Sequence, residues 1–301
     1  MTVEELPRAG IRLLWLDLTR NCQLECTHCY NRSGPKGTHG TMTRENWISV
    51  LDQAAEHGVQ SVQFIGGEPT MHPNFPELVD RALNLGLDVE VFSNLVHVSA
   101  RCWELFRRDG LSLATSYYSD QADQHDAMTR RPSHRRTRRN IGHAVSLGIP
   151  VRVGIISADD EQQVTATRLD LQSLGVTRIG VDHLRPFGRG GQDQSPDVSN
   201  LCGGCGNRKA AIGPEGTVSP CVFSAFLDVG NVRSAPLADI LGGAAMAQAN
   251  ATVRGAVRAA RPCYPDNAPC SPDNAPPQTC GPDDEGECHP GTPPSTCSPR
   301  R

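Results

Sequence analysis

The sequence has no long apolar run: none of its 301 residues lie in a stretch that reaches the roughly 20 apolar residues of a membrane-spanning helix. The first residues, MTVEELPRAG, lack the basic region and apolar run of a secretory signal. The net charge of -4 is small and gives no reason to expect nucleic-acid binding. We therefore expect a cytoplasmic protein with neither a membrane nor a nucleic acid as partner.

Cysteine is abundant by contrast, with 12 residues in uneven groups. Cytoplasmic proteins keep their thiols reduced, so clustered cysteines there favour metal binding over disulfides. Three cysteines lie between Cys22 and Cys29, and eight lie between Cys202 and Cys297. Cys102 stands alone in a helix-like stretch, where a small packed residue is expected. The chain therefore contains two candidate metal-binding regions.

Short apolar runs alternate with longer amphipathic segments over the first part of the chain. The runs are rich in β-branched residues, as buried parallel strands are, and begin at Leu13, Ser61, Asp88, Leu111, Val151 and Arg178. The segments between them end at a glycine followed by an apolar residue, which predicts left-handed helix caps at Gly58, Gly86, Gly110, Gly148 and Gly175.

This alternation predicts an α/β fold with a parallel sheet. Six strands are too few for a complete eight-stranded barrel, so an open, partial barrel and a doubly wound sheet both remain. In either fold, ligands bind at the C-terminal ends of the strands.

The pattern changes after residue 191. The segment IGPEGTV from Ile212 predicts two short strands around a turn, and the segment from Pro236 predicts one or two helices. The tail repeats one cysteine, proline and aspartate pattern over residues 263–280 and 280–297, with almost no apolar residues to build a core. We expect two domains, residues 1–195 and a cysteine-rich unit of residues 196–301.

Cys22, Cys26 and Cys29 follow the first predicted strand within a few residues, which places them at the C-terminal edge of the sheet. Three thiolates on a four-iron cluster leave one iron open, and an open metal position is where chemistry occurs. Structural zinc instead prefers four protein ligands. On this triplet alone, a zinc knuckle or a chance grouping remains an alternative.

A second motif, Gly66-Gly67-Glu68-Pro69, directly follows the second predicted strand and so lies at the same edge. Glycine lets the backbone approach a ligand closely, and Glu68 supplies an anion suited to an ammonium group. Taken alone, this motif is better explained as an ordinary turn between a strand and a helix.

Together, NCQLECTHCYN and IGGEPTMHP resemble the cluster motif and the cofactor motif of the radical S-adenosylmethionine (SAM) superfamily. The chain is most similar to the peptide-modifying branch that carries a C-terminal SPASM or twitch domain. The resemblance extends from about Ile11 to Leu241. It implies a partial (β/α)6 barrel of the TIM type, followed by a SPASM-like or twitch-like domain.

The resemblance implies that Cys22, Cys26 and Cys29 hold a [4Fe–4S] cluster whose open iron binds SAM. The cluster reduces SAM, and the 5′-deoxyadenosyl radical that results removes a hydrogen atom from the substrate. The residues implied to contact SAM are His28, Tyr30, Gly66, Gly67, Glu68, Pro69, Asn94 and Ser116, with Arg131 as a further candidate. The resemblance assigns no catalytic acid or base.

The reaction requires a strongly reducing electron. The glutathione pool lies at roughly −220 to −320 mV, whereas plant-type ferredoxins reach about −400 mV. We therefore expect a flavodoxin-class or ferredoxin-class donor.

Cys205, Gly216 and Cys221 are spaced as in the opening of a SPASM or twitch domain, where cysteines flank a hairpin and bind an auxiliary [4Fe–4S] cluster. The compact cysteine run of a full SPASM domain is missing. One or two auxiliary clusters are expected, with ligands drawn from Cys202, Cys205, Cys221, Cys263, Cys270, Cys280, Cys288 and Cys297. Disulfides or zinc in the tail remain alternatives.

The branch implies a ribosomally made peptide as substrate, modified by a cross-link, a thioether or epimerisation. With only about ten residues before the first strand, the leader of that peptide would need a separate binding protein or would dock on the barrel. The run RRPSHRRTRR from Arg130 is either such a docking site or an ordinary solvated helix face. Tyr117, Tyr118 and Asp120 are candidates for the substrate pocket. A twitch-type enzyme acting on a small molecule such as an aminoglycoside sugar, and a non-catalytic iron–sulfur electron carrier, are the alternatives.

Overall fold

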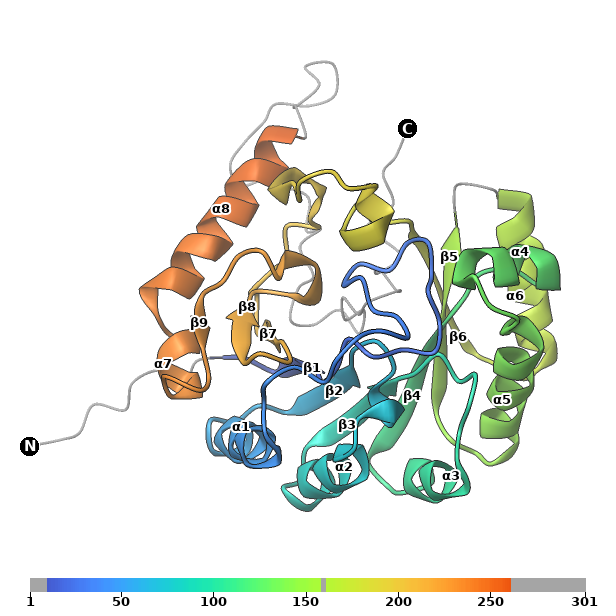
Figure 1. Cartoon of the computed structure of the whole chain (residues 1–301), viewed down its shortest axis with the longest axis horizontal. Coiled ribbons are helices and arrows are strands. Elements are labelled where there is room, and N and C mark those ends of the chain that lie inside the picture. The colour runs from blue at the N-terminus through green and yellow to red at the C-terminus, as the bar shows by residue number, and fades with distance from the viewer. Residues whose placement is uncertain (1–9, 158–160, 261–301) are drawn as a thin grey trace, which may run out of the picture.

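The computed structural model describes residues 10–157 and 161–260. All six predicted strands are present, and they pair in parallel in the order of the sequence. They are β1 (Leu13–Asp17), β2 (Ser61–Ile65), β3 (Asp88–Phe92), β4 (Leu111–Tyr117), β5 (Val151–Ser157) and β6 (Arg178–His183). The sheet curves into the open, partial barrel that the sequence predicts (Figure 1).

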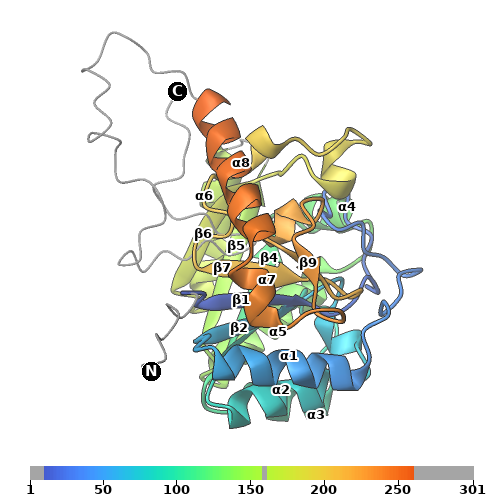
Figure 2. The ribbon, with the colours of Figure 1, turned by 90° about the vertical axis from the view of Figure 1, so that its left-hand side faces the viewer.

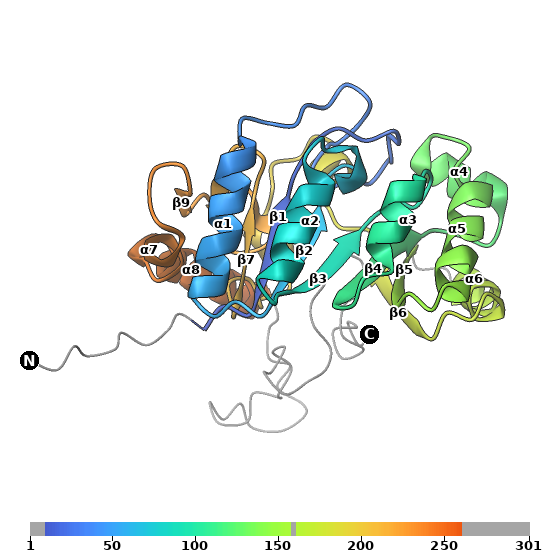
Figure 3. The same ribbon diagram turned by 90° about the horizontal axis from the view of Figure 1, so that it is seen from below.

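Five helices cover the outer face of this sheet, as the view from below shows (Figure 3). They are α1 (Arg44–Glu56), α2 (Phe75–Asn84), α3 (Ala100–Phe106), α5 (His134–Ser146) and α6 (Glu161–Ser173). Alternate strand residues such as Leu14, Phe64 and Val153 are buried against these helices in the main apolar core. The remaining strand residues face the inside of the barrel, because successive side chains of a strand point to opposite faces.

The predicted helix caps are confirmed. All five glycines have a positive φ between 72° and 86°. After four of them, the amide of the following apolar residue donates to the carbonyl five residues earlier, as Val59 does to Ala54 at 3.0 Å. The apolar residues that follow the glycines are all buried in the main core. These caps therefore fix where each strand begins.

The C-terminal part of the chain extends the same sheet. Strand β7 (Lys209–Ile212) pairs in parallel with β1, and β8 (Thr217–Ser219) and β9 (Gly230–Asn231) follow in antiparallel order. The expected hairpin is thus present, and its first strand makes β1 an interior strand of a nine-stranded sheet. The two helices that follow are α7 (Leu237–Leu241) and α8 (Ala244–Ala260), beside β7 and β8 (Figure 2).

A second apolar cluster joins the barrel interior to the C-terminal part. Trp15 and Ile65 from the barrel strands pack there with Leu201, Cys221 and, on α8, Val253. Burial of this cluster holds the hairpin against the inner face of the barrel, since apolar area removed from water stabilises the contact. No helix within the described ranges is both long enough and apolar enough to cross a bilayer.

Candidate functional site

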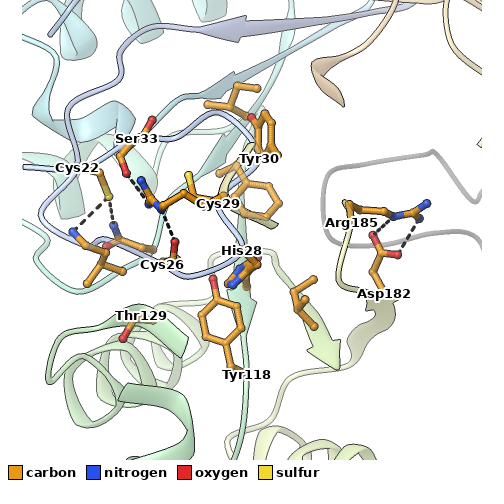
Figure 4. A pocket seen from close by; sticks show the side chains of 18 of the residues that line it. Cys22, Cys26, His28, Cys29, Tyr30, Ser33, Tyr118, Thr129, Asp182 and Arg185 are labelled. Atoms are coloured by element: carbon orange, nitrogen blue, oxygen red, sulfur yellow. Dashed lines mark hydrogen bonds and ion pairs between the residues drawn. The ribbon is translucent and has the colours of Figure 1, made fainter. Parts of the chain in front are cut away.

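Cys22, Cys26 and Cys29 lie on the loop between β1 and α1, and all three line one cavity at the C-terminal ends of the strands (Figure 4). The cavity contains about 1050 Å³ of empty space, including its open mouth. The structure therefore brings the three predicted thiols together where the fold places ligands.

The backbone of the cysteine loop contacts the loop after β2 directly. The amide of Gly67 donates to the carbonyl of Thr19 at 2.6 Å, and the amide of Glu68 donates to that of Asn21 at 2.9 Å. A Cβ atom at Gly67 would lie less than 3.0 Å from the carbonyl oxygen of Asn21 and from the Cβ of Cys22. Gly66 and Gly67 line the cavity, and glycine is required here by contact with the cysteine loop itself.

A short 3-10 helix after β6, η2 (Gly188–Gly191), holds the other side of the cysteine loop. A Cβ atom at Gly188, whose φ is 57°, would lie less than 3.0 Å from the carbonyls of Cys29 and Tyr30. The amide of Arg189 donates to Cys29 at 2.9 Å.

The guanidinium of Arg189 binds the same loop. Its Nε donates to the carbonyl of Cys26 and its Nη2 to that of Ser33, both at 2.7 Å. Sequence reasoning missed this arginine. The signal was the run Gly188-Arg-Gly-Gly directly after the sixth strand, since three glycines around one charged residue indicate close backbone packing.

Glu68 is buried, with 1% of its surface exposed, and is not among the residues that line the cavity. Its carboxylate accepts hydrogen bonds from the amide and hydroxyl of Thr70, from the hydroxyl of Ser93 and from the amide of Asn94. Burial raises the pKa of Glu68, and these four donors oppose that effect. Glu68 therefore joins the end of β2 to the end of β3. The neighbouring Pro69 is also buried and is not among the residues that line the cavity.

The sulfur of Cys22 receives hydrogen bonds from the amide of Leu24 at 3.4 Å and from Nδ2 of Asn94 at 3.6 Å. Burial raises the pKa of all three thiols, that of Cys26 to about 12, while the charge of Arg189 acts to lower the pKa of Cys26 and Cys29. Thiols in this environment stay protonated at pH 7 unless a metal replaces the proton.

An iron–sulfur cube fits this set of donors. Within residues 10–157 and 161–260, no three cysteine, histidine or carboxylate side chains are close enough to hold a single metal ion. A cube does not require such convergence, because its irons occupy separate corners and each takes its own thiolate. Three thiols spread around one cavity therefore suit a cluster better than a zinc ion.

The other predicted cofactor residues His28, Tyr30, Asn94 and Ser116 also line the cavity. The ring of His28 lies edge-on to that of Tyr118, with 4.8 Å between centroids. Burial and the nearby charge of Arg189 lower the pKa of His28 to about 4, so its imidazole is neutral at pH 7.

The prediction that Tyr117 and Tyr118 both line the pocket is wrong for Tyr117. Tyr118 lines the cavity, whereas Tyr117 points to the outer side of β4, where its hydroxyl bonds to His134 at 2.8 Å and to Asp170 at 3.1 Å. Consecutive residues of a strand cannot face the same side. Asp120 and Arg131 are not among the lining residues either.

The end of β6 supplies a wall that sequence reasoning did not find. Asp182 and Arg185 line the cavity, and Nη2 of Arg185 donates to Oδ1 of Asp182 at 2.7 Å (Figure 4). The guanidinium of Arg185 also lies 5.9 Å from the ring centroid of Phe223. A charged pair at a strand end was the available signal, because parallel strands end at the ligand site.

A second group of thiols lies on the C-terminal hairpin. Cys205 precedes β7 and Cys221 follows β8, and their sulfurs are 3.2 Å apart and buried. Cys202 lies in the loop before Cys205, and the two thiols shift each other's pKa in opposite directions. All three are free cysteines. Tyr30, which follows Cys29, contacts Phe223, which follows Cys221, with 5.0 Å between the ring centroids. The predicted ligands in the tail all lie outside the described residues. They are Cys263, Cys270, Cys280, Cys288 and Cys297.

Two family models match the chain. The model of the radical SAM superfamily matches residues 16–161, and the model of SPASM, an iron–sulfur cluster-binding domain, matches residues 202–272. The first range contains all three cavity cysteines, and the second contains the hairpin cysteines.

Two relatives match part of the chain. The PqqA peptide cyclase of Streptomyces rochei is 31% identical over 179 residues, which are 58% of this chain and 49% of that protein. The antilisterial bacteriocin subtilosin biosynthesis protein AlbA of Bacillus subtilis (strain 168) is 27% identical over 178 residues, 58% of this chain and 40% of that protein. The chain therefore spans less than half of the length of either relative.

The fold is also shared with a solved structure. Streptococcus suis SuiB bound to its precursor peptide SuiA superposes with a TM-score of 0.66 at 17% identity, over 81% of this chain and 66% of that chain. A likeness at this identity concerns the fold.

Gly188→Ala is expected to displace the cysteine loop, because the added Cβ would collide with the carbonyls of Cys29 and Tyr30. Gly148→Ala is the matched control: its φ of 72° is equally left-handed, but no atom lies within 4 Å of the added Cβ. The control should lose only the roughly 1–2 kcal/mol that alanine costs in this conformation. Urea unfolding and iron content after reconstitution measure both effects. Equal losses of stability and iron in the two variants would contradict the contact.

Proposed function

Since this chain is an enzyme of the radical SAM superfamily with an iron–sulfur SPASM domain, we propose that it modifies a ribosomally made peptide by reductive cleavage of SAM and hydrogen-atom abstraction. The observation that supports this most is one cavity lined by three cysteines, by Gly66 and Gly67, and by Ser116. An electron carrier needs no such cavity beside its cluster, so the enzymatic alternative is favoured.

Cys22, Cys26 and Cys29 hold the [4Fe–4S] cluster in this proposal. The chemistry that the bound cluster supplies is one-electron reduction of SAM, which gives methionine and a 5′-deoxyadenosyl radical that takes a hydrogen atom from the substrate. The protein positions these groups and excludes water. Arg189 fixes the carbonyls of Cys26 and Ser33, and the donors of Leu24 and Asn94 orient the sulfur of Cys22.

The SAM-facing residues are those that line the cavity beside the cysteines. Gly66 and Gly67 line the cavity and would present backbone groups to the amino acid part of SAM, and Ser116 at the end of β4 would meet the ribose. His28 and Tyr30 would border the adenine, and Asn94, which donates to the sulfur of Cys22, would also contact the cofactor. Glu68 and Pro69 do not face SAM in this proposal. They fix the loops that carry the SAM-facing residues.

The hairpin cysteines Cys202, Cys205 and Cys221 are proposed as ligands of an auxiliary [4Fe–4S] cluster, completed by one or more of the five tail cysteines. Their total number allows one or two such clusters. In this division, residues 1–195 carry the SAM chemistry and residues 196–301 carry the auxiliary cluster.

A peptide substrate is supported by what the relatives are named for. The Streptomyces rochei relative is a cyclase of the PqqA peptide, the Bacillus subtilis relative takes part in subtilosin biosynthesis, and SuiB binds the precursor peptide SuiA. The leader of such a peptide would be bound by a separate protein or by the barrel. A flavodoxin-class or ferredoxin-class donor supplies the electron, and the reducing cytoplasm suits the clustered thiols.

Cys26→Ala is expected to lower 5′-deoxyadenosine formation with SAM and dithionite by more than about a hundredfold, because loss of even an outer-shell partner costs a metal site 10–100-fold. Cys102→Ala is the matched control, since Cys102 lies on α3 and its thiol is buried in the main apolar core. It should retain the wild-type yield per folded protein. Full activity of Cys26→Ala in anaerobic assays would refute the assignment.

Iron counting tests the auxiliary cluster separately. The wild type should bind more than about four iron atoms per chain, the content of one cube. Substitution of Cys22, Cys26 and Cys29 together by alanine should remove one cube and leave iron at the hairpin. A triple variant free of iron would exclude the second site.

A further inference from the structure

Five exposed arginines surround the turn between α4 (Ala122–Thr129) and α5. We name this surface the arginine face, and its members are Arg130, Arg131, Arg135, Arg136 and Arg139. Of these five arginines, only Arg131 forms an ion pair within the described ranges, and its partner is Glu25 at 3.8 Å. The face is a local feature, because the whole chain has a net charge of -4.

Asp126, close to this turn, forms no ion pair with the arginine face within the described residues. Its Oδ1 accepts from the amides of Ser133 and His134 at 2.8 Å each, at the start of α5. Arg135 and Arg139 lie four residues apart on one side of α5, where like charges repel. A surface that keeps such repulsion uncompensated favours a partner of opposite charge.

The arginine face adjoins the cysteine loop. The amides of Glu25 and Thr27, on either side of Cys26, donate to the carbonyls of Thr129 and Met128 at 3.2 and 2.9 Å. Figure 3 shows α4 next to the loop that follows β1.

At this turn the wall between cavity and solvent is thin. Thr129 is fully buried and lines the cavity beside Cys26, whereas the next residue, Arg130, is exposed (Figure 4). The turn is held in place, because the Thr129 hydroxyl bonds to Ser133 at 2.7 Å and to the carbonyl of Arg131 at 2.9 Å.

We propose that the arginine face docks an acidic one-electron carrier of the flavodoxin or ferredoxin class, whose electron enters the cluster across the Thr129 turn. This assignment rests on the proposed function. The donor is oxidised by one electron and the cluster is reduced by one, with no bond made or broken. Electron transfer slows steeply with distance, so a donor benefits from docking beside Cys26. The donor is favoured over an acidic leader peptide because an electron can cross the buried Thr129 turn, whereas a peptide chain cannot.

The test compares two charge-reversed variants of the full chain. Each replaces three arginines by glutamate, so the net charge changes by the same amount in both. The arginine-face variant carries Arg130→Glu, Arg135→Glu and Arg136→Glu. The control carries Arg101→Glu on α3, Arg107→Glu directly after α3 and Arg254→Glu on α8, all at exposed positions. Glutamate in the first turn of α5 is compatible with the helix dipole, so the arginine-face variant should fold. Equal iron content in both variants and the wild type verifies this.

Two readouts use a purified acidic bacterial flavodoxin. Its Kd for the chain, measured with increasing salt, should rise by about tenfold or more in the arginine-face variant and stay unchanged in the control. Formation of 5′-deoxyadenosine with reduced flavodoxin should fall by a similar factor, while formation with dithionite stays at the wild-type level.

Three results would count against the docking face. Flavodoxin affinity and flavodoxin-supported turnover that match the wild type overturn it. Weakened binding of an acidic precursor peptide with unchanged flavodoxin affinity assigns the face to the leader instead. A flavodoxin that supports both variants equally at every salt concentration shows that the arginines form only a solvated surface. Failure of the proposed function is distinct, because the wild type would then give no 5′-deoxyadenosine with dithionite.

Discussion

The backbone of the cysteine loop touches two other loops at distances that leave no room for a Cβ atom. Gly67 meets it from the end of β2, and Gly188 meets it from beyond the end of β6. Hydrogen bonds from the amides of Gly67 and Arg189 to the carbonyls of Thr19 and Cys29 join the three segments. The positions of the thiols therefore depend on these main-chain contacts, to which the Arg189 guanidinium adds hydrogen bonds to the carbonyls of Cys26 and Ser33.

This double contact explains how a long loop can present three thiols to one cavity. A loop of this length would cost considerable entropy to order by its own interactions. Here the barrel orders it, because β2 and β6, which precede Gly67 and Gly188, are fixed by the parallel sheet and by the apolar core behind it. The second apolar cluster then places the hairpin thiols on the same side, with Tyr30 and Phe223 between the two groups.

The elements governed by local chemistry were predictable from the sequence. The strand starts and the glycine caps follow from periodicity and from the left-handed conformation, and both are confirmed. The pairing of β7 with β1 was not predictable, because it depends on the long-range cluster around Trp15. Glu90 and Arg152 interrupt apolar strands, and only the folded sheet shows that they form an ion pair at 2.7 Å on the inner face of the barrel.

The site residues that belong to a motif of fixed spacing were predictable, and those defined by contacts between distant segments were not. The three cysteines and two glycines were found by their positions after the strands, and all five line the cavity. Glu68 joins the ends of β2 and β3, and Arg189 holds the cysteine loop. Both roles depend on hydrogen-bond partners that are far away in the sequence. The assignment of Tyr117 failed because a strand end carries two faces and only one meets the cavity.

The central claim is that three thiolates hold a cluster whose fourth iron binds SAM. The most direct measurement is electron paramagnetic resonance of the dithionite-reduced protein in which Cys202, Cys205 and Cys221 are replaced by alanine, with and without SAM. The account predicts the signal of a reduced [4Fe–4S] cluster that changes when SAM is added. A protein that holds zinc instead, or a cluster signal that SAM leaves unchanged, would contradict it.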